Sequence, residues 1–199
     1  MTIPSNLQVG DRFTMGEWVG EPIRWRVLYV TDPILPYKKA VVITERAIDC
    51  RPYHESKADV TWEKCSLREF LNGFFYDEAF TQVEKEHIVE AGVSYPENPE
   101  ASPQERVVIK DKVHCLSAFE AQWMFRGDFD RIAQPSKFAE WKGANPCDGT
   151  GNCYWWLRSP GRSQSDAAFV SSSGYISLRG IPVYDETVAV RPAMWITFG

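Results

Sequence analysis

The fold of this chain is decided by a stretch near its end, Cys153-Tyr154-Trp155-Trp156-Leu157-Arg158-Ser159-Pro160-Gly161. Three consecutive aromatic residues are followed there by an arginine and a Pro-Gly turn. A second stretch of similar character is Val190-Arg191-Pro192-Ala193-Met194-Trp195-Ile196. Aromatic and β-branched residues favour strands, and Pro and Gly favour the turns that end them. We therefore predict that both stretches are strands and that they form a rigid aromatic frame around the residues between them.

Composition and charge limit the kind of protein that this chain forms. The chain has 199 residues, of which 44% are hydrophobic and 25% charged, which suits one globular domain over residues 1–199. A net charge of -5 without a Lys/Arg run argues against a nucleic-acid partner. No apolar stretch approaches the roughly 20 residues that span a bilayer, so we expect no membrane insertion. The start lacks the features of a signal peptide, so we expect a cytoplasmic or phage-associated protein.

The rest of the chain predicts strands first, helices next and short strands last. Apolar residues alternate with polar ones over Ile23–Val30, and Ala40–Thr44 is a short apolar run, so the two predict an antiparallel hairpin. Turn residues separate the late strands, which are expected at 154–158, 167–170, 175–178, 188–191 and 193–196. Residues 107–109 and 113–116 flank Lys110-Asp111-Lys112, and either segment is expected to pair as a short strand. This order of elements predicts an α+β fold.

Capping boxes predict where the helices of the middle part begin. They are Ser66–Glu69, Thr81–Glu84 and Ser117–Glu120. We expect the first helix to end at Gly73, the second to run to about Ala91-Gly92, and the third to reach about Phe125. Residues 136–141 predict another short helix, and the Pro-rich residues 95–106 predict a surface loop.

Five groups of residues together resemble a bacterial family known only as domain of unknown function 6273, which is common in gut Firmicutes and their phages. The groups are Pro22–Leu28, Thr61–Asn72, Asp111–Ser117, Trp155–Gly161 and Val190–Ile196. That family is similar to the C-type-lectin-like superfamily, which includes the formylglycine-generating enzymes, and to the ligand-binding proteins diversified by retroelements. The resemblance implies a C-type-lectin-like fold, with short antiparallel strands, two or more helices and long loops. It also implies that the termini lie together and that late loops form the ligand surface.

The resemblance implies that residues 162–187 are the ligand-binding and variable segment. The positions expected to contact a ligand are Arg162, Ser163, Gln164, Asp166, Ser171, Ser172, Ser173, Tyr175, Ser177, Leu178, Arg179, Tyr184, Asp185 and Glu186. Aromatic, Ser and charged side chains among them resemble the adaptable contact residues of antibodies. Scaffold residues alternate with them, namely Ala167, Phe169, Val170, Gly174, Ile176, Gly180 and Val183.

A second set of residues is expected to hold the fold. It comprises Trp25, Trp62, Trp155, Trp156, Arg158, Arg191 and Trp195. The functional alternative is that the two arginines clamp a carboxylate or phosphate and that the late tryptophans stack on a sugar ring. We favour the structural interpretation, because an arginine beside tryptophans commonly stacks on them and binds loop carbonyls.

The cysteines predict no metal centre. Cys50, Cys65, Cys115, Cys147 and Cys153 include no CxxC pair, so buried, reduced thiols are expected, with a Cys147–Cys153 disulfide as the alternative. The loop 148–152 offers oxygen ligands but is too short for an EF-hand, so we expect no cofactor and keep calcium as an alternative. His114 and Cys115 are neighbours in a probable strand and would point to opposite faces, which argues against a nucleophile and base pair.

These observations favour a non-catalytic module that binds a protein or a glycan through its C-terminal loops. The calcium-ligating triplets of sugar-binding C-type lectins do not occur in the sequence. One alternative is an oxidoreductase of the formylglycine-generating or another cysteine-dependent type. The other is a structural module associated with a phage tail. The residues do not identify the ligand or the oligomeric state.

Overall fold

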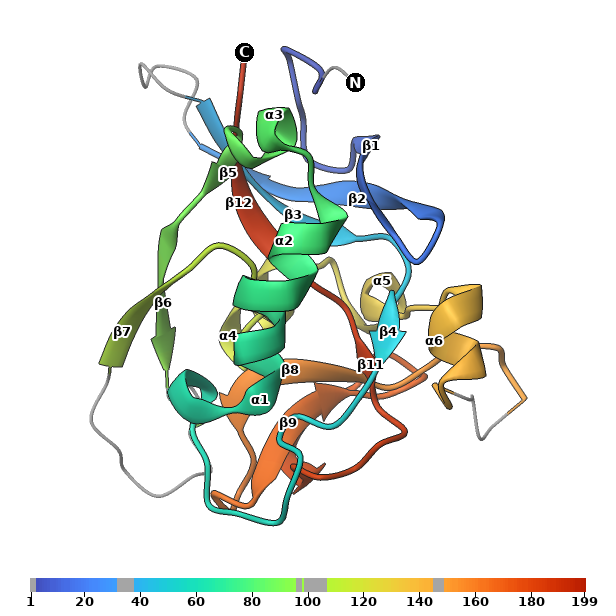
Figure 1. Cartoon of the computed structure of the whole chain (residues 1–199). Coiled ribbons are helices and arrows are strands. Elements are labelled where there is room, and N and C mark those ends of the chain that lie inside the picture. The colour runs from blue at the N-terminus through green and yellow to red at the C-terminus, as the bar shows by residue number, and fades with distance from the viewer. Residues whose placement is uncertain (1–2, 32–37, 96–97, 99–106, 145–148) are drawn as a thin grey trace.

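Two five-stranded sheets carry the architecture, and short helices cover them (Figure 1). The computed structural model describes residues 3–31, 38–95, 98, 107–144 and 149–199. Most of the predicted loop 95–106, and also Cys147 and Asp148, lie outside the described residues. Among the described strand pairs only β8 and β11 run parallel, and the others are antiparallel. The predicted mixture of mostly antiparallel strands with few helices is confirmed.

The first sheet contains the N-terminal hairpin and the C-terminal strand. Its order is β1 (Arg12–Trp18), β2 (Glu21–Val30), β3 (Lys38–Thr44), β12 (Ala193–Phe198) and β5 (Ile88–Val89). The predicted antiparallel pairing of β2 with β3 is confirmed. The second sheet has the order β10 (Ile176–Pro182), β9 (Asp166–Val170), β8 (Trp155–Pro160), β11 (Ala189–Val190) and β4 (Asp49–Cys50). A separate hairpin consists of β6 (Ala91–Tyr95) and β7 (Val107–Asp111).

The helices are short. They are η1 (Trp62–Lys64), α1 (Ser66–Phe70), the π-helical turn η2 (Leu71–Phe75), α2 (Tyr76–Ala79), α3 (Gln82–Lys85), α4 (Ala118–Met124), α5 (Asp128–Arg131) and α6 (Lys137–Trp141). The capping boxes predicted at Thr81 and Ser117 both form. The helix predicted at Ser136 also forms, with the Ser136 hydroxyl as its N-cap.

The prediction for the helix beginning at Ser66 was wrong at both ends. Cys65 is the N-cap, and its Sγ accepts a hydrogen bond from the Arg68 amide at 3.4 Å. Gly73 does not end the helix, because α1 continues through η2 into α2. Leu71 and Phe75 on either side of Gly73 are fully buried, and their burial outweighs the cost of about 1 kcal/mol for a glycine inside a helix.

The predicted end of the next helix was also wrong. The helix after Thr81 ends at Lys85 instead of Ala91, because β5 joins the edge of the first sheet and pairs with β12. Of the two segments of which either was expected to pair as a strand, 107–109 pairs within β7, whereas 113–116 forms only an isolated bridge, between His114 and Ala193. Its four side chains are nevertheless buried, so this segment crosses the core.

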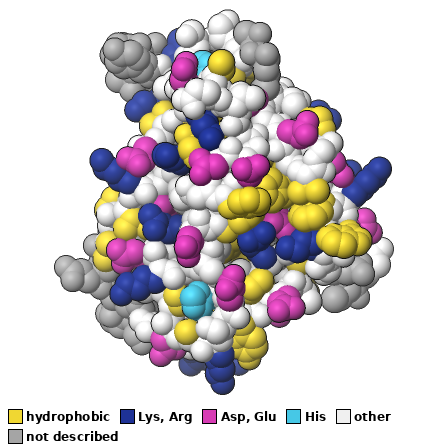
Figure 2. Space-filling view, in the orientation of Figure 1, with side chains coloured by type: hydrophobic (Ala, Val, Ile, Leu, Met, Phe, Trp, Pro, Cys, Tyr) yellow, Lys and Arg dark blue, Asp and Glu magenta, His cyan; other side chains and the backbone are white. Residues whose placement is uncertain are grey.

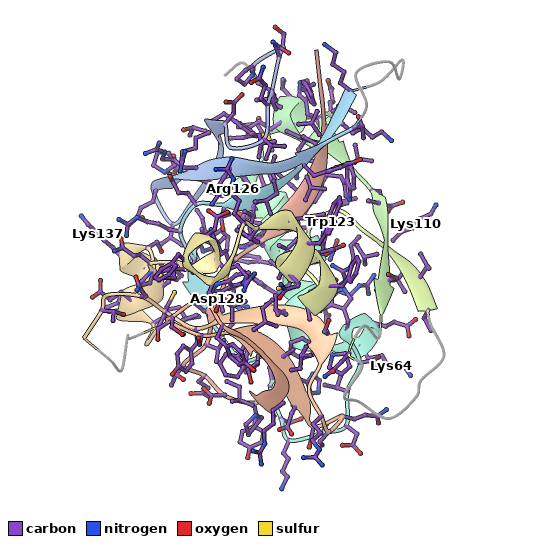
Figure 3. All side chains as sticks on the ribbon, turned by 180° about the vertical axis from the view of Figure 1, so that it is seen from behind. Lys64, Lys110, Trp123, Arg126, Asp128 and Lys137 are labelled. Atoms are coloured by element: carbon purple, nitrogen blue, oxygen red, sulfur yellow. The ribbon has the colours of Figure 1, made fainter. Side chains whose placement is uncertain are left out.

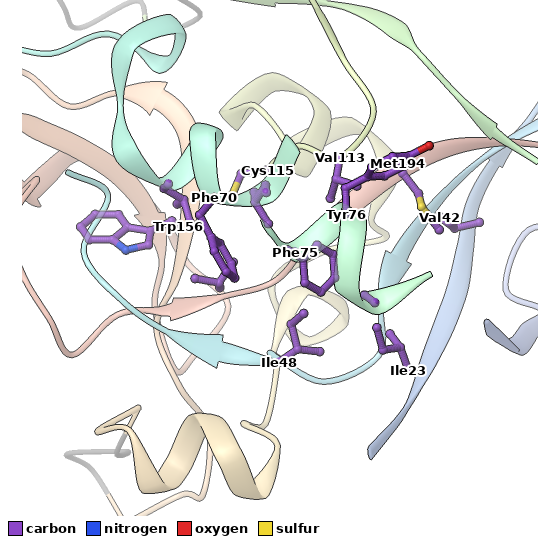
Figure 4. Close-up of a cluster of buried hydrophobic side chains, with 14 of the residues drawn as sticks. Ile23, Val42, Ile48, Phe70, Phe75, Tyr76, Val113, Cys115, Trp156 and Met194 are labelled. Atoms are coloured by element: carbon purple, nitrogen blue, oxygen red, sulfur yellow. The ribbon is translucent and has the colours of Figure 1, made fainter. Parts of the chain in front are cut away.

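The paired tryptophans of β8 reflect burial on both faces of the second sheet. Trp155 belongs to one buried cluster and Trp156 to the other, as the alternation of side chains along a strand requires. The Trp156 cluster also contains Phe75 of η2 and Met194 of β12 (Figure 4). A strand covered on both faces has no polar side to expose, so even Arg158 and Ser159 of β8 are buried.

Each fully buried tryptophan finds an acceptor for its indole N–H, as a buried polar group requires. The pairs are Trp25 with the Met15 carbonyl at 2.8 Å, Trp62 with the Asp111 carboxylate at 2.8 Å, Trp155 with the Arg131 carbonyl at 3.1 Å, and Trp156 with the Arg51 carbonyl at 2.9 Å. These bonds orient large side chains and join segments far apart in the sequence.

Arg158 connects β8 to three other segments. Its guanidinium donates to the carbonyls of Ser94 at 3.1 Å and Cys115 at 3.0 Å, and it forms a bidentate pair with the Glu120 carboxylate of α4. The Arg158 side chain is only 1% exposed and that of Glu120 is 23% exposed. Burial alone would raise the pKa of Glu120, but the charge and hydrogen bonds of Arg158, with smaller contributions from His114 and the Ser117 amide, together hold this pKa below its usual value.

Replacing Glu120 by Gln should therefore destabilise the protein in a pH-dependent way. At pH 7 the change leaves the buried Arg158 charge without its partner, so the free energy of unfolding should fall by about 3 kcal/mol. Because the folded pKa of Glu120 is lowered, its contribution is complete above the unfolded pKa and is lost as the pH falls through the folded pKa. Denaturant unfolding from pH 7 down to pH 3 should show the two proteins converging. A difference that stays constant with pH would contradict this account.

Candidate functional site

The predicted ligand-binding residues lie at two ends of the second sheet and along β9 and β10 between these ends. Strands β8, β9 and β10 follow one another in antiparallel order, so successive connections lie at opposite ends. The loop after β8 and the loop after β10 meet at one end, where the Val183 amide donates to the Ser165 carbonyl at 3.0 Å. The β9–β10 turn over 171–175 lies at the other end. A strand of five residues such as β9 spans about 17 Å, so the ends are well separated.

Exposure differs among the predicted positions. The exposed side chains are Arg162, Ser163, Gln164, Ser173, Tyr175, Arg179, Tyr184 and Glu186, and the half-buried ones are Asp166, Ser171, Ser177, Leu178 and Asp185. Ser172 is buried, which leaves little of it for a ligand. Leu178 packs against the Trp155 cluster and so has a structural contact. All the predicted scaffold positions are buried except Gly180, which is half-buried.

The β9–β10 turn is fixed to α5 by a buried arginine. The Arg131 side chain is 2% exposed; its Nε donates to the Gly174 carbonyl at 2.9 Å, and its guanidinium also pairs with Asp128. Gly174 has a φ of +83° and is so close to α5 that a Cβ would stand 1.8 Å from the Asp128 carbonyl oxygen. Only glycine fits there, and the turn and α5 form one rigid surface.

Asp128 and Gly174, which lie in contact, are each followed in the sequence by a strongly exposed aromatic residue. Phe129 comes directly after Asp128 and is 90% exposed, and Tyr175 comes directly after Gly174 and is 62% exposed. Phe129 was not identified from the sequence, although an aromatic residue between the acids Asp128 and Asp130 is a signal for exposure. Figure 3 labels Asp128 of α5 and Trp123 of α4 in the view from behind. Because the side chains of Phe129 and Tyr175 are largely solvent-exposed, they contribute little to the core and remain available for a partner.

The other end of the sheet carries a more polar surface. Arg162, Gln164, Arg179 and Tyr184 are exposed there. The backbone beneath them is tightly packed, because a Cβ on Gly161 would stand 2.8 Å from the Arg179 carbonyl oxygen. The Arg162 amide donates to this same carbonyl at 3.0 Å.

The arginines and tryptophans expected to hold the fold lie inside it. The Arg191 guanidinium is 2% exposed and donates to the carbonyls of Thr44 at 2.9 Å and Arg131 at 3.0 Å. It also lies 5.1 Å from the centre of the Trp155 ring, and its burial lowers the pKa to about 10. Trp195 is half-buried and packs edge-on against Tyr29 at 5.9 Å. Arg158 and Arg191 are thus enclosed by acceptors of the chain itself, which argues against an exchangeable anion as their partner.

The thiols and the central histidine are poorly placed for chemistry. Burial raises the pKa of Cys50, Cys65 and Cys153 to about 12 and that of Cys115 further. Burial also lowers the pKa of His114 to about 4. Within the described residues, no three His, Cys, Asp or Glu side chains are grouped to hold a metal ion. Because Cys147 and Asp148 lie outside them, the disulfide and the calcium loop remain predictions.

None of the helices that the structure describes is long and apolar enough to cross a membrane.

Comparison with known proteins identifies a family. The sequence profile described as "Domain of unknown function (DUF6273)" matches residues 37–198. This range contains both sheets' late strands and the aromatic stretch of β8. Neither the curated proteins nor the solved structures contain a match to the chain. Since the match covers most of the sequence, this protein belongs to the family of domain of unknown function 6273.

Proposed function

We propose that this protein is a binding module with a C-type-lectin-like fold that presents the ends of its second sheet to a protein or glycan ligand. Three features support the fold. The two termini lie together, and a Cβ on Gly199 would stand 3.6 Å from the Ser5 carbonyl oxygen (Figure 1). The last strand, β12, enters the sheet of the N-terminal hairpin. The residues between β8 and β12 form strands β9, β10 and β11 of the second sheet and the loops that connect them.

The observation that carries the proposal is the rigid presentation of Phe129 and Tyr175. Each exposed aromatic residue forgoes about 1.5–3 kcal/mol that burial of a large apolar side chain provides. Arg131 and Gly174 meanwhile hold the backbone beneath them in place. A partner that covers both rings gains this apolar contact with little loss of backbone freedom, which is how aromatic anchors work in binding interfaces.

The second end would add polar contacts to the same or another ligand. Arg162, Arg179 and Glu186 can form ion pairs or hydrogen bonds, and Tyr184 offers an amphipathic ring. The exposed positions at both ends tolerate substitution because few of their atoms contact the core. That property fits a variable surface, and a neighbouring reverse transcriptase with an adenine-mutated template repeat in the genome would support diversification by a retroelement.

Replacing Phe129 and Tyr175 together by Ala should remove binding and leave stability unchanged. The probe is the fluorescently labelled chain, applied to a panel of bacterial cells whose surfaces display both proteins and glycans. We expect binding to fall at least tenfold, because both aromatic contacts are lost, while the melting temperature stays within about 2 °C. Protease treatment of the cells removes a protein ligand, and periodate oxidation removes a glycan ligand.

The matched control is Val108→Ala, which removes an exposed apolar side chain from β7. It should leave binding unchanged. Unaltered binding of the double variant would refute the role of Phe129 and Tyr175. A fall in melting temperature of more than about 5 °C would show instead that the two rings stabilise the fold.

The buried thiols argue against the alternative of a cysteine-dependent oxidoreductase, and their reactivity tests it. In a Cys147→Ser variant the remaining thiols are the four buried ones. With a pKa of about 12 in place of 9.0, Cys50 should form on the order of a thousandfold less thiolate at pH 8. Ellman's reagent should therefore react with these thiols only after unfolding. A thiol that reacts rapidly in the folded protein would contradict this argument and would support the cysteine-dependent oxidoreductase.

A further inference from the structure

A hollow of about 790 Å³ opens on a face of the protein that the proposed ligand surface does not include. This volume is in the range of small-molecule binding sites, about 300–1,000 Å³. Figure 2 shows hydrophobic side chains gathered on this face between the regions of α2 and α6, with Lys and Arg side chains beside them. The residues that line the hollow are Arg51, Pro52, Glu55, Ser66, Glu69, Phe70, Gly73, Phe74 and Lys142.

A buried carboxylate fixes the two cations on one side of the hollow. The Asp49 side chain is completely buried and accepts hydrogen bonds from the Arg51 guanidinium at 2.8 and 3.2 Å. The Lys142 ammonium reaches the other oxygen of the same carboxylate at 3.3 Å. Arg51 also lies 3.3 Å from the centre of the Phe70 ring. Arg51 and Lys142 are therefore held in position, and Asp49 neutralises about half of their charge.

Carboxylates and an exposed aromatic ring also line the hollow, on and beside α1 and η2. The Glu55 amide is bonded to the Ser66 hydroxyl at 3.1 Å, and Glu69 lies one turn further along α1. Neither Glu55 nor Glu69 belongs to an ion pair formed within the described part of the chain. Phe74 is 63% exposed and is among the residues that line the hollow.

The glycine at position 73 is an independent observation that supports a ligand in this hollow. A glycine inside a helix is less favourable than alanine. Neither the backbone nor the packing requires glycine here, because its φ is not in the left-handed region and a Cβ would have no atom within 4 Å. Gly73 lines the hollow, so the consequence of having no side chain at this position is that the hollow stays open.

We infer that this hollow is a binding site for a neutral saccharide. Hydroxyl groups both donate and accept hydrogen bonds, so one sugar can donate to Glu55 and Glu69 and accept from Arg51 and Lys142. The apolar C–H face of a sugar ring can pack on the exposed Phe74 ring. The inference does not rest on the proposed function, because neither Phe129 nor any of residues 162–187 lines the hollow.

Charge selects a neutral ligand over an ionic one. Arg51 and Lys142 stand against Glu55 and Glu69 of the lining and the buried Asp49, so the site holds charges of both signs. A phosphate or carboxylate group would meet the two glutamates, and an amine would meet the two cations. Either ion would gain less than a polyhydroxyl ligand that uses both kinds of group.

The test is saturation-transfer NMR of the purified chain with lactose, maltose, cellobiose and diacetylchitobiose, followed by titration of any sugar that gives a signal. Glucose 6-phosphate and glucosamine serve as charged comparators. We expect at least one neutral disaccharide to bind saturably. Gly73→Trp should weaken it at least tenfold by filling the hollow, whereas Gly73→Ala should retain affinity within about twofold and raise the melting temperature.

Glu69→Ala keeps the test decisive if the tryptophan variant does not fold. It removes an exposed carboxylate of the lining and should weaken the sugar about tenfold, as expected for a lost hydrogen bond to a charged group. The matched control Glu78→Ala removes an exposed acid from α2, which is outside the lining, and should have no effect. Three results would overturn the inference: no saturable neutral sugar, equal binding by Gly73→Trp or Glu69→Ala, or binding of the charged comparators alone. Tyr175→Ala should leave sugar binding intact, which separates this site from the proposed ligand surface.

Discussion

The structure depends on the buried pair of Arg158 and Glu120. The guanidinium joins β8 to α4 through the carboxylate and to two further segments through the carbonyls of Ser94 and Cys115. A buried charge without its partner destabilises a fold strongly, so this pair helps to fix the four segments relative to one another. Arg191 plays a similar connecting role. It lies between β11 and β12, where the chain leaves the second sheet and enters the first, and it donates hydrogen bonds to the carbonyls of Thr44 and Arg131. Both arginines thus connect loops and strands that the sheets alone would leave independent.

This internal framework explains how large side chains can remain outside the core. Arg131, a third buried arginine, fixes the β9–β10 turn to α5, and Phe129 and Tyr175 project from the resulting surface. Polar and aromatic residues at the other end of the sheet stand on equally tight backbone packing around Gly161. The architecture therefore separates residues that hold the fold from residues that are available for contact. A binding module requires that separation, because its contact residues must be free to differ without loss of stability.

Local chemistry predicted much of the fold, and long-range packing decided the rest. The aromatic pair Trp155-Trp156 predicted the central strand β8 correctly, and the capping boxes at Thr81 and Ser117 predicted two helix starts. Gly73 misled the prediction because burial of its neighbours outweighs the low helix propensity of glycine, and no nearby residue reveals that burial. The sequence also could not show that residues 162–187 are divided between two ends of a sheet. This division follows from strand pairing, which joins residues that sequence order keeps apart.

The central claim is that residues 162–187 combine structural anchors with exposed positions that the fold does not need. An alanine scan of this segment, with a melting temperature for each variant, tests it without knowledge of the ligand. We predict changes within about 2 °C at Arg162, Gln164, Tyr175 and Tyr184, and losses of several degrees where Phe169, Ile176 and Val183 are truncated. Similar losses at exposed and buried positions would contradict the account, because the exposed residues would then belong to the framework that they are proposed to stand on.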